Sequence, residues 1–391
     1  MTADSTIAPH RPAGTPAPGI AIVRLANFVT PTSGGLRTFL GEVGQGYLRA
    51  GNRCALVIPG PADRDELTPA GRQVTLRAPR VPGGAGYHLL ASRTRVLGAL
   101  ARLRPDVVEV SDKLTMGWVG PWAAARGIPL VLFSHERLDA VLAARLPRWF
   151  PLEPATDRVN RRLAGLADAV VCASGFSAAE FERLGYGALV HRLPLGVDLT
   201  AFAPAARPRA GAGRGRLLVT ISRLSKEKRP ELAVDAVRDL VADGVPTRLL
   251  MIGDGPMRAE LARRAGDLPV RFLGFLGRHA VAHVLSHADA LLAPAPAESF
   301  GLAVLESLAC GTPVVVPDRG AAQELVSPGA GIVTAATATG LAQGVRTVLS
   351  RPEPARRAAA RARAEQFPWS STVDRMLALY RTLGLVPARA A

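Results

Sequence analysis

Two glutamates, Glu298 and Glu306, stand eight residues apart in the stretch ADALLAPAPAESFGLAVLESLACGTPVVVP. Carboxylates accept hydrogen bonds from hydroxyl groups such as those of a sugar. A helical pattern opens between the two acids, near residue 300, and a helix N-terminus offers N–H groups and a positive dipole end to a phosphate. A ligand with both hydroxyl and phosphate groups suits this set, so the stretch predicts a nucleotide-sugar site.

Two cations, Arg223 and Lys228, follow an expected strand at Leu217–Ile221 in the segment ISRLSKEKRPE. Ligands of open α/β sheets bind at the carboxyl ends of the strands, and positive charge fixed there stabilises a departing diphosphate. For this segment on its own, the alternative is an exposed charged turn in which Glu227 pairs with a neighbour. Glu298 is expected at the same edge of the same sheet, which favours the functional interpretation.

Four residues of the first half could face the same ligand from the other side. Gly34 and Gly35, in TPTSGGLRT, allow close approach of the backbone to a ligand, although a plain turn also explains them. His135, in FSHERLD, follows an expected strand at Leu130–Phe133 and could hydrogen-bond a sugar hydroxyl or share a proton with it. A lone histidine is more often a structural hydrogen-bonding group. Asp112, after another expected strand, is a weaker candidate for acceptor contact.

The elements that must position these residues form two series of alternating strands and helices. The first has strand-like runs at Ile20–Asn27, Cys54–Ile58, Val107–Val110, Leu130–Phe133, Ala169–Ala173 and Val190–Leu193, and helical patterns at His88–Leu103 and Glu153–Leu166. The second has strand-like runs at Leu217–Ile221, Arg248–Ile252, Val270–Leu273, Ala290–Ala293 and Val314–Val316, with helices at Pro230–Asp243, Pro256–Ala265 and His279–Ser286. Two such series predict an α/β fold of two Rossmann-like, doubly wound domains that face each other across a cleft.

Breaks in these patterns set the expected domain boundaries. Residues 1–18 read as a polar, proline-rich, disordered leader without the order of a signal peptide, and Ala203–Gly215 is the best linker candidate. We therefore expect an N-terminal acceptor domain at 19–200 and a C-terminal nucleotide-sugar donor domain at 201–369. The last helix, at 370–386, carries apolar residues that need a surface to cover.

Composition narrows the class of protein. A chain of 391 residues is long enough for two cores, and no apolar run approaches the about 18 residues of a membrane span. Cys54, Cys172 and Cys310 are widely separated without metal-ligand spacing, so we expect buried thiols in a reducing cytoplasm. The net charge of +16 predicts attraction to anionic surfaces, with an arginine-rich solvated surface as the alternative.

Several motifs that suggest other functions are weak. Asp63-Arg64-Asp65 has the D-x-D form of a divalent-metal site, but it lies in a polar loop not directly preceded by a strand end, so a surface turn is favoured. GDGPMRAE, at Gly253–Glu260, lacks the G-x-G-x-x-G spacing and reads as a strand-to-helix turn. The sequence has no P-loop and no G-x-S-x-G motif. With 5% aromatic residues and no nucleic-acid-binding motif, we expect no nucleic-acid partner.

The helical pattern at His88–Leu103 mixes leucines and arginines, as does a helix that lies on a membrane surface. A helix whose apolar face packs on its own sheet has the same pattern. We favour packing, and keep membrane contact as the alternative.

With these residues in place, the chain resembles the family-4 retaining glycosyltransferases of GT-B fold. Within that family it is most similar to the GDP-mannose-dependent phosphatidylinositol mannoside α-mannosyltransferases of actinobacteria, in particular the α-1,6-mannosyltransferases that act on the dimannoside. The Glu-x7-Glu pair is specific for the family. The likeness extends over nearly the whole chain after the leader, in the segments ANFVTPTSGGLRT, VVEVSDKLT, SHERLD, LPLGVDL, SRLSKEKRPE, ESFGLAVLESLACGTPVVV and RARAEQFPW.

The resemblance implies a role for each candidate residue. The implied catalytic residues are His135, Arg223, Lys228 and Glu298, and the donor site also includes Gly34, Gly35, Ser222, Phe272, Phe300, Gly301, Leu302 and Glu306. The cations would bind the diphosphate together with the N–H groups of residues 300–302 and the glycine loop, while Glu298 would hold the transferred sugar and Glu306 the ribose. Asp112 and Arg137 would contact the acceptor. The terminal helix would cross back onto the first domain, and no metal or other cofactor would be needed.

The implied reaction moves a mannosyl group from GDP-mannose, with retention of configuration, to a hydroxyl of a phosphatidylinositol mannoside or a similar glycolipid or polyol. The acceptor proton would pass to the leaving phosphate, so no protein base is assigned. The enzyme would work in the cytoplasm, with peripheral binding to the inner face of the plasma membrane as a further expectation. The alternatives are another nucleotide-sugar donor with a soluble or specialised-metabolite acceptor, a nucleotide-sugar epimerase, and a non-enzymatic binder of polyanions or lipid.

Overall fold

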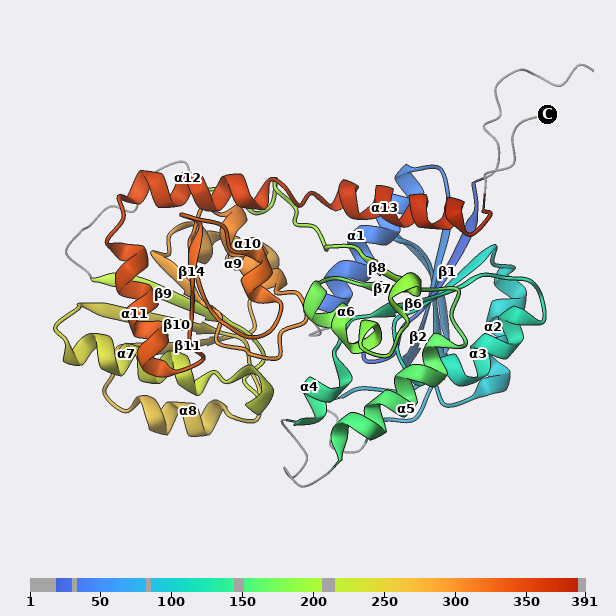
Figure 1. The fold of residues 1–391 in the computed structure, drawn as a ribbon, viewed down its shortest axis with the longest axis horizontal. Coiled ribbons are helices and arrows are strands. Elements are labelled where there is room, and N and C mark those ends of the chain that lie inside the picture. The colour runs from blue at the N-terminus through green and yellow to red at the C-terminus, as the bar shows by residue number, and fades with distance from the viewer. Residues whose placement is uncertain (1–18, 30–33, 82–85, 144–150, 206–214, 386–391) are drawn as a thin grey trace, which may run out of the picture.

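The computed structural model of the protein describes residues 19–29, 34–81, 86–143, 151–205 and 215–385. The expected leader at 1–18 and most of the expected linker lie outside the described residues. Two sheets, each covered by helices, lie side by side along the long axis of the molecule (Figure 1).

The first domain is built on a sheet whose described strands run in the order β3-β4-β2-β1-β5-β6-β7-β8. These strands are β1 (Ala21–Leu25), β2 (Arg53–Gly60), β3 (Arg64–Thr68), β4 (Gly71–Arg77), β5 (Val107–Val110), β6 (Leu130–Ser134), β7 (Ala169–Cys172) and β8 (Val190–Arg192). The helices are α1 (Gly35–Arg49), α2 (Arg93–Leu103), α3 (Met116–Ala124), α4 (Leu138–Ala143), α5 (Leu152–Ala164) and α6 (Gly175–Glu182). The central strands are fully buried and pair in parallel, as expected when helices cover both faces of a sheet.

The second domain is built on a parallel sheet whose described strands run in the order β11-β10-β9-β12-β13-β14. Its strands are β9 (Arg216–Ile221), β10 (Thr247–Ile252), β11 (Val270–Gly274), β12 (Ala290–Leu292), β13 (Val314–Pro317) and β14 (Gly331–Thr334). Its helices are α7 (Glu231–Ala242), α8 (Arg258–Ala265), α9 (Arg278–Ser286), α10 (Leu302–Ala309), α11 (Ala338–Leu349) and α12 (Glu353–Ala364), with short 3-10 turns η3 (Lys226–Lys228) and η4 (Ala322–Leu325).

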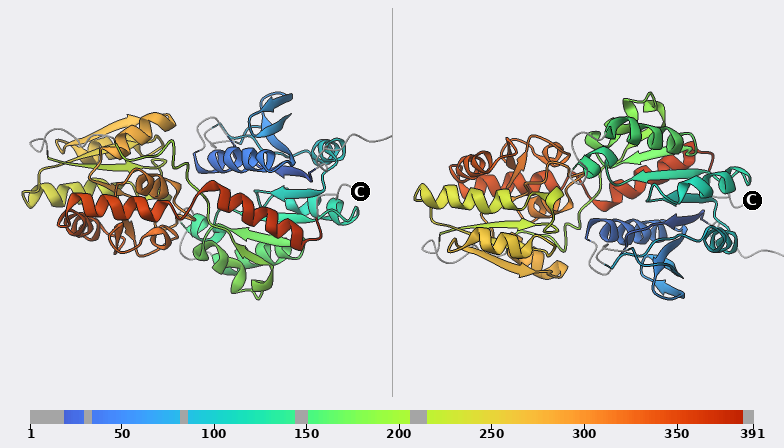
Figure 2. Two further views of the ribbon diagram at one scale, coloured as in Figure 1. Left: turned by 90° about the horizontal axis from the view of Figure 1, so that it is seen from above. Right: turned by 90° about the horizontal axis from the view of Figure 1, so that it is seen from below.

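The last helix, α13 (Trp369–Thr382), returns to the first domain (Figure 2). The outgoing and returning chain segments run side by side, because the Val197 N–H donates to the Phe367 carbonyl at 2.9 Å. Helix α13 then packs on α1, where a Cβ added to Gly46 would lie 2.3 Å from Val373 Cγ2. The expected return of the terminal helix to the first domain is confirmed.

A buried polar cluster anchors α13 to the first sheet. Glu109 of β5 is fully buried, and its Oε1 accepts a hydrogen bond from the Tyr47 hydroxyl at 2.6 Å and another from the Tyr380 hydroxyl. The two tyrosine hydroxyls are 2.9 Å apart. Arg24 of β1, also buried, lies 3.5 Å from the second carboxylate oxygen of Glu109. The terminal helix therefore completes a hydrogen-bonded network inside the domain formed by the start of the chain.

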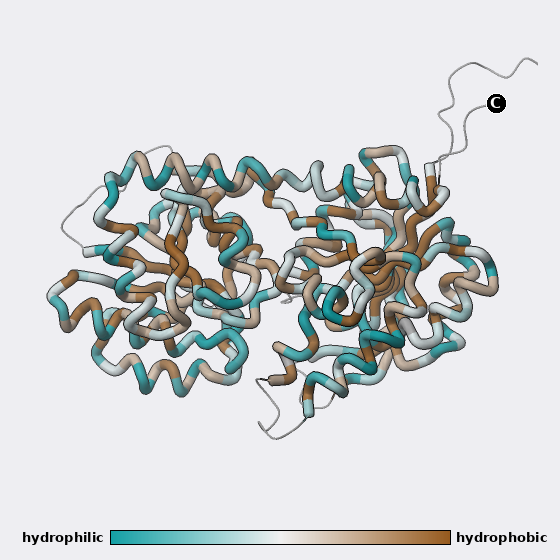
Figure 3. The backbone as a smooth tube through the Cα atoms, viewed as in Figure 1, coloured by the Kyte–Doolittle hydropathy of each residue, from teal (hydrophilic) through white to brown (hydrophobic). Residues whose placement is uncertain are grey.

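The strands inside each domain are mostly apolar and the outer helices are more polar, as the hydropathy colouring of Figure 3 shows. One of the buried clusters includes residues of both domains, for example Phe39 of α1, Phe300 after β12 and Tyr380 of α13. The two domains thus share apolar contacts where the cleft would open.

The structure differs from the sequence-based expectation at the outer edge of the first sheet. Arg64–Thr68 is not a surface turn but the strand β3, which pairs antiparallel with β4. Its residues are mostly exposed and charged, so no apolar alternation marks it as a strand. The D-x-D acids bond to neighbouring arginines: Asp63 to Arg95, and Asp65 to Arg72 at 2.7 Å.

The amphipathic pattern at 88–103 forms the shorter helix α2, which begins at Arg93. Val96, Ala99 and Leu100 are buried in the cluster on the first sheet. Packing on the sheet, the interpretation that we favoured, is therefore confirmed. Among the described residues, no helix combines the length and apolarity needed to cross a membrane.

Candidate donor-binding and catalytic site

The charged residues predicted to bind the donor meet at the carboxyl edge of the second sheet. β9 is flanked by β10 on one side and β12 on the other, so the chain order reverses between β9 and β12. Such a reversal opens a crevice in which α/β proteins bind ligands. Lys228 follows β9 and Glu298 follows β12, and Lys228 Nζ lies 2.8 Å from Glu298 Oε2. The structure thus brings together two residues that are 70 positions apart.

The electrostatics of this pair keep both groups ionised at neutral pH. Burial opposes the charge on each, but the pair outweighs burial: the pKa of Lys228 is raised and the pKa of Glu298 is lowered. Backbone N–H groups of Phe300 and Ser299 also donate to the Glu298 carboxylate and favour its charged form. Each side chain of the pair is still more than a quarter exposed, at 28% and 29%, and so open to a ligand.

Arg223 is exposed beyond the end of β9, and its guanidinium makes no hydrogen bond or ion pair with any residue that the structure describes. It can therefore turn its guanidinium toward an anion without breaking an existing contact. Ser222, beside it, has a hydroxyl that is buried and unpartnered among the described residues.

Two helix N-termini face each other across the domain boundary. Helix α10 begins at Leu302, after Gly301 at a φ of +99° that favours glycine. Helix α1 begins at Gly35, and a Cβ added there would lie 3.4 Å from Leu302 Cδ1. Positive dipole ends from both domains therefore converge on one place, as a diphosphate site requires. The Phe300 N–H, expected to bind phosphate, instead donates to Glu298 in this structure.

His135 follows β6 and is packed among aromatic rings. Its ring stacks on Phe133 at 4.4 Å and meets Phe39 edge-on at 4.8 Å, while Nε2 lies 3.1 Å from Ser111 Oγ. Burial, with a smaller contribution from Arg24, lowers the pKa of His135 to about 3. The imidazole is therefore neutral at physiological pH and can act as a hydrogen-bonding group but not as a cation.

Glu306 lies on α10, partly buried. Burial raises its pKa to about 7, while the nearby Arg278 acts in the opposite direction. Arg278 itself joins the domains, since it pairs with Glu42 of α1 at 2.8 Å and with Asp198 at 3.1 Å. A ligand hydroxyl or cation near Glu306 would stabilise its ionised form.

Three residues predicted to contact donor or acceptor have local partners in this structure. Asp112 is buried and accepts hydrogen bonds from the Leu114 and Thr115 N–H groups and the Thr115 hydroxyl, so it orders the turn before α3. Arg137 is held by both oxygens of Asp139 at 2.8 and 3.0 Å. Phe272 packs against the apolar cluster of the second domain. A motif shows neither burial nor local pairing, and the predicted ligand contacts of these three residues stay predictions.

The structure also shows residues at the cleft that sequence reasoning missed. Ser174 and Ser177, at the start of α6, reach the Ser299 carbonyl of the donor loop, and Glu324 of η4 reaches the same helix. Phe275 is 59% exposed just after β11, at the carboxyl edge of the second sheet. No motif marks the serines, because their partner lies more than 120 residues away. Among the described residues, no group of three or more His, Cys, Asp or Glu side chains could hold a metal ion.

Comparison with known proteins agrees with this geometry. Residues 33–201 match the family described as Glycosyltransferase Family 4, and residues 205–365 match the family described as Glycosyl transferases group 1. The GDP-mannose-dependent alpha-(1-6)-phosphatidylinositol dimannoside mannosyltransferase of Mycobacterium tuberculosis is 42% identical over 93% of this chain and 96% of its own length. The D-inositol 3-phosphate glycosyltransferase of Rhodococcus erythropolis is 32% identical over 68% of this chain and 65% of its own length.

Solved structures share the fold at lower identity. Sucrose-phosphate synthase from Thermosynechococcus elongatus superposes with a TM-score of 0.76 at 24% identity and covers 93% of this chain and 98% of its own. Anabaena Alr3699/HepE, in complex with UDP and glucose, has a TM-score of 0.71 at 19% identity over 93% of this chain and 99% of its own.

Two facing Rossmann-like domains, each matched by a glycosyltransferase family, define a glycosyltransferase of the GT-B class. The family matches and the identity to the mycobacterial enzyme then fix its place more narrowly. The chain belongs to glycosyltransferase family 4.

Proposed function

We propose that this protein is a retaining α-mannosyltransferase that moves a mannosyl group from GDP-mannose to a hydroxyl of a phosphatidylinositol mannoside. The observation that carries the proposal is the Lys228–Glu298 pair at the strand-order reversal, opposite the N-terminus of α1. The choice of mannose and of a mannosylated lipid rests on the mycobacterial relative, whose likeness extends over almost the whole of both chains.

The donor would lie between the two helix N-termini. Arg223 and Lys228 would neutralise the diphosphate, together with the free N–H groups at the start of α10. Glu298 would then release Lys228 in part and accept hydrogen bonds from the mannosyl hydroxyls, and Glu306 would accept from the ribose. Both members of the ion pair are already charged, so donor binding needs no proton transfer between them.

Transfer would proceed through an oxocarbenium-like transition state. Positioning and fixed positive charge supply the catalysis, because the negative charge that develops lies on the departing diphosphate. His135 is neutral and suited to a hydrogen bond with the sugar, but its low pKa makes it a weak base that would not take the proton of the acceptor hydroxyl. We therefore assign the acceptor proton to the leaving phosphate. Since two cations already face the diphosphate, we propose that no metal is required.

The acceptor would reach the cleft from a membrane surface. The net charge of +16 favours contact with anionic lipid, and α5 of the first domain presents exposed arginines. We propose peripheral binding to the cytoplasmic face of the plasma membrane, where a lipid-linked mannoside is accessible.

A panel of GDP-, UDP- and ADP-sugars, incubated with a phosphatidylinositol dimannoside and scored by released nucleotide, tests the function. We expect turnover with GDP-mannose, dependent on acceptor and unchanged by a chelator. Lys228→Ala should reduce turnover on the order of 100-fold or more, because a preorganised charge on the leaving group is lost. Glu227→Gln, a change in the same 3-10 turn outside the ion pair, is the matched control and should retain turnover.

Two outcomes would contradict the proposal. Preference for another nucleotide-sugar, or nucleotide release without an acceptor, would point to a different transferase or to an epimerase. Full activity of Lys228→Ala would remove the assignment of the diphosphate site.

A further inference from the structure

Helix α6 of the first domain contacts the loop of the second domain that carries Glu298. Ser174 Oγ donates to the Ser299 carbonyl at 2.7 Å, and Ser177 Oγ donates to the same carbonyl at 3.1 Å. All three residues are buried, with Ser177 fully so. Ser299 is adjacent to Glu298 in the chain, so two hydroxyls of one domain fix the backbone beside a sugar-binding carboxylate of the other.

A second contact joins the same helix to η4, the element whose neighbouring residue holds the loop that carries Glu298. The Glu324 carboxylate accepts from the Gly175 N–H at 2.9 Å and from the Phe176 N–H at 2.8 Å, at the N-terminus of α6. This is a favourable place for a negative charge. Glu324 belongs to η4, and the residue before η4, Ala321, donates its N–H to the Glu298 carbonyl at 2.7 Å.

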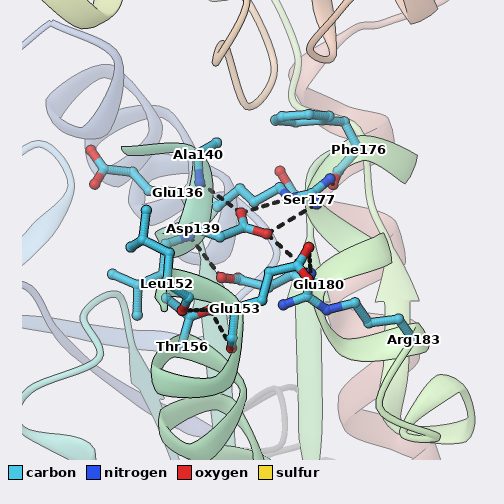
Figure 4. A network of polar contacts seen from close by, with 12 residues as sticks. Glu136, Asp139, Ala140, Leu152, Glu153, Thr156, Phe176, Ser177, Glu180 and Arg183 are labelled. Carbon is cyan, nitrogen blue, oxygen red and sulfur yellow. Dashed lines mark hydrogen bonds and ion pairs between the residues drawn. The ribbon is translucent and has the colours of Figure 1, made fainter. Parts of the chain in front are cut away.

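The C-terminal part of α6 contacts the start of helix α4, a few residues after His135 (Figure 4). Glu180, fully buried, accepts from the Leu138 N–H at 2.7 Å and from Lys113 Nζ at 2.7 Å. Arg183, just after the helix, pairs with Asp139 at 3.1 Å. One short helix therefore contacts both the start of α4, three residues after His135, and the second-domain loop that carries Glu298.

We propose that Ser174 and Ser177 are positioning residues for glycosyl transfer. They fix the positions of the Glu298 carboxylate and the start of α10 relative to His135. They can do so only when the two domains are closed. The inference rests on the transfer reaction proposed above and adds a requirement to it: closure must be completed by these two hydroxyls. Misplacement of a sugar-binding group by about 1 Å can cost on the order of 100-fold in rate.

The double variant Ser174→Asp/Ser177→Ala separates this role from helix stability. Ser174 also caps α6, because its hydroxyl accepts from the Ser177 N–H at 3.1 Å. An aspartate keeps the cap, but neither new side chain can donate to a carbonyl. We expect the α6 cap to be kept, and kcat to fall on the order of 100-fold while KM for the donor changes far less.

Thr337→Ala is the matched control. Thr337 caps α11 in the same way, by accepting from the Gly340 N–H at 3.0 Å, but its hydroxyl contacts no described residue of the first domain. This variant should lose stability and keep kcat. The single variant Ser174→Thr keeps a hydroxyl that can both cap α6 and donate to the Ser299 carbonyl. It should retain most of the wild-type rate.

Small-angle scattering of the ligand-free protein provides a readout that needs no substrate. The double variant should have a larger radius of gyration than the wild type, because the domains open, and the Thr337→Ala control should not. If the wild type is inactive with GDP-mannose, that result counts against the proposed function. The scattering comparison would still show whether the two serines hold the domains closed. Wild-type kcat in the double variant, or an unchanged radius of gyration, would overturn the inference.

Discussion

Glu306 carries an unfavourable charge in the folded protein at neutral pH. Its pKa is raised by burial from an ordinary value of 4.5 to about 7, and no described side chain hydrogen-bonds it. A carboxylate intended for the two hydroxyls of a ribose would have this property, because the ligand supplies the hydrogen bonds that water supplied in the unfolded chain. In the proposed function, the cost of burying this carboxylate would be recovered when the donor binds.

This cost predicts how stability depends on pH. Between pH 4.5 and about pH 7 the folded protein binds more protons at Glu306 than the unfolded chain does, so the contribution of this residue to stability falls as pH rises through that window. Glu306→Gln removes the charge, and we expect it to raise the free energy of unfolding at pH 8 by about 1–3 kcal/mol but to leave it nearly unchanged at pH 4.5. Urea unfolding at both pH values measures the difference. Equal effects at the two pH values would contradict the assignment.

At the scale of single residues, the sequence predicts those site residues that stand in short motifs. Glu298, Lys228 and Arg223 are recognisable because each stands a few residues after an apolar strand, and the edges of neighbouring strands meet by geometry. Asp112 and Arg137 stand at similar positions, yet local partners satisfy both. Whether a polar side chain already has hydrogen-bond partners depends on its neighbours in space. The sequence alone does not give these neighbours.

At the scale of elements, the packing of α13 on α1 depends on a missing side chain. Gly46 stands where a Cβ would lie 2.3 Å from Val373 Cγ2, and a valine cannot withdraw its branched methyl groups by a simple rotation. Glycine in the interior of a helix normally lowers stability, so its presence here indicates a close approach of two helices.

A double-mutant cycle tests this contact. We expect Gly46→Ala to destabilise the protein by about 1–3 kcal/mol despite its better helix propensity, because of overpacking. In Gly46→Ala/Val373→Ala the clash is relieved, so the two changes should be far from additive in thermal or urea unfolding. Gly98→Ala in α2, where an added Cβ meets only the tip of Arg102 at 3.8 Å, is the control and should be neutral or stabilising. Simple additivity would show that the helices are not in close contact.

Elements that bury apolar residues on both faces were predictable, and exposed ones were not. The central strands β6 and β7 have apolar runs, β5 is apolar except for Glu109, and all three lie within a residue of the predicted ranges. The edge strand β3 has a charged, exposed sequence, and the short helix α6 has neither a long period nor a strong amphipathic face. Such elements are held by tertiary contacts, which a local pattern does not contain.

At the scale of the whole molecule, part of the positive charge faces inward. On α12, Arg361 donates to the carbonyls of Leu199, Phe202 and Ala309, and Arg363 donates to that of Leu325. These arginines hold α12 against the second domain and the chain segment between the domains. Net charge alone therefore overstates the charge that a membrane would meet.

The arginines that do face outward predict how the protein binds lipid. Arg158, Arg161 and Arg162 of α5 are exposed on the first domain. We expect the wild type to co-sediment with vesicles that contain anionic lipid, less so as salt shortens the screening length from about 10 Å at 0.1 M to about 3 Å at 1 M. Changing all three arginines to glutamine should weaken binding by about 1 kcal/mol per charge.

A triple change on the second domain controls for net charge. Arg258, Arg263 and Arg271 are exposed there, and their replacement by glutamine removes the same charge from a different face. If this variant loses as much vesicle binding as the α5 variant, attraction is diffuse and α5 is not the contact. Binding that salt does not change would count against an electrostatic origin.

The hydrogen bond from the Tyr380 hydroxyl to Glu109 affects the order in which the protein folds during synthesis. A ribosome delivers the first sheet early, yet the residue that completes its interior emerges only after the entire second domain has been made. Until then Glu109 and Arg24 lack the Tyr380 hydroxyl as a partner, and the first domain is incompletely packed. Supplying the terminal helix as a separate peptide to a chain truncated before it would be expected to restore that missing piece.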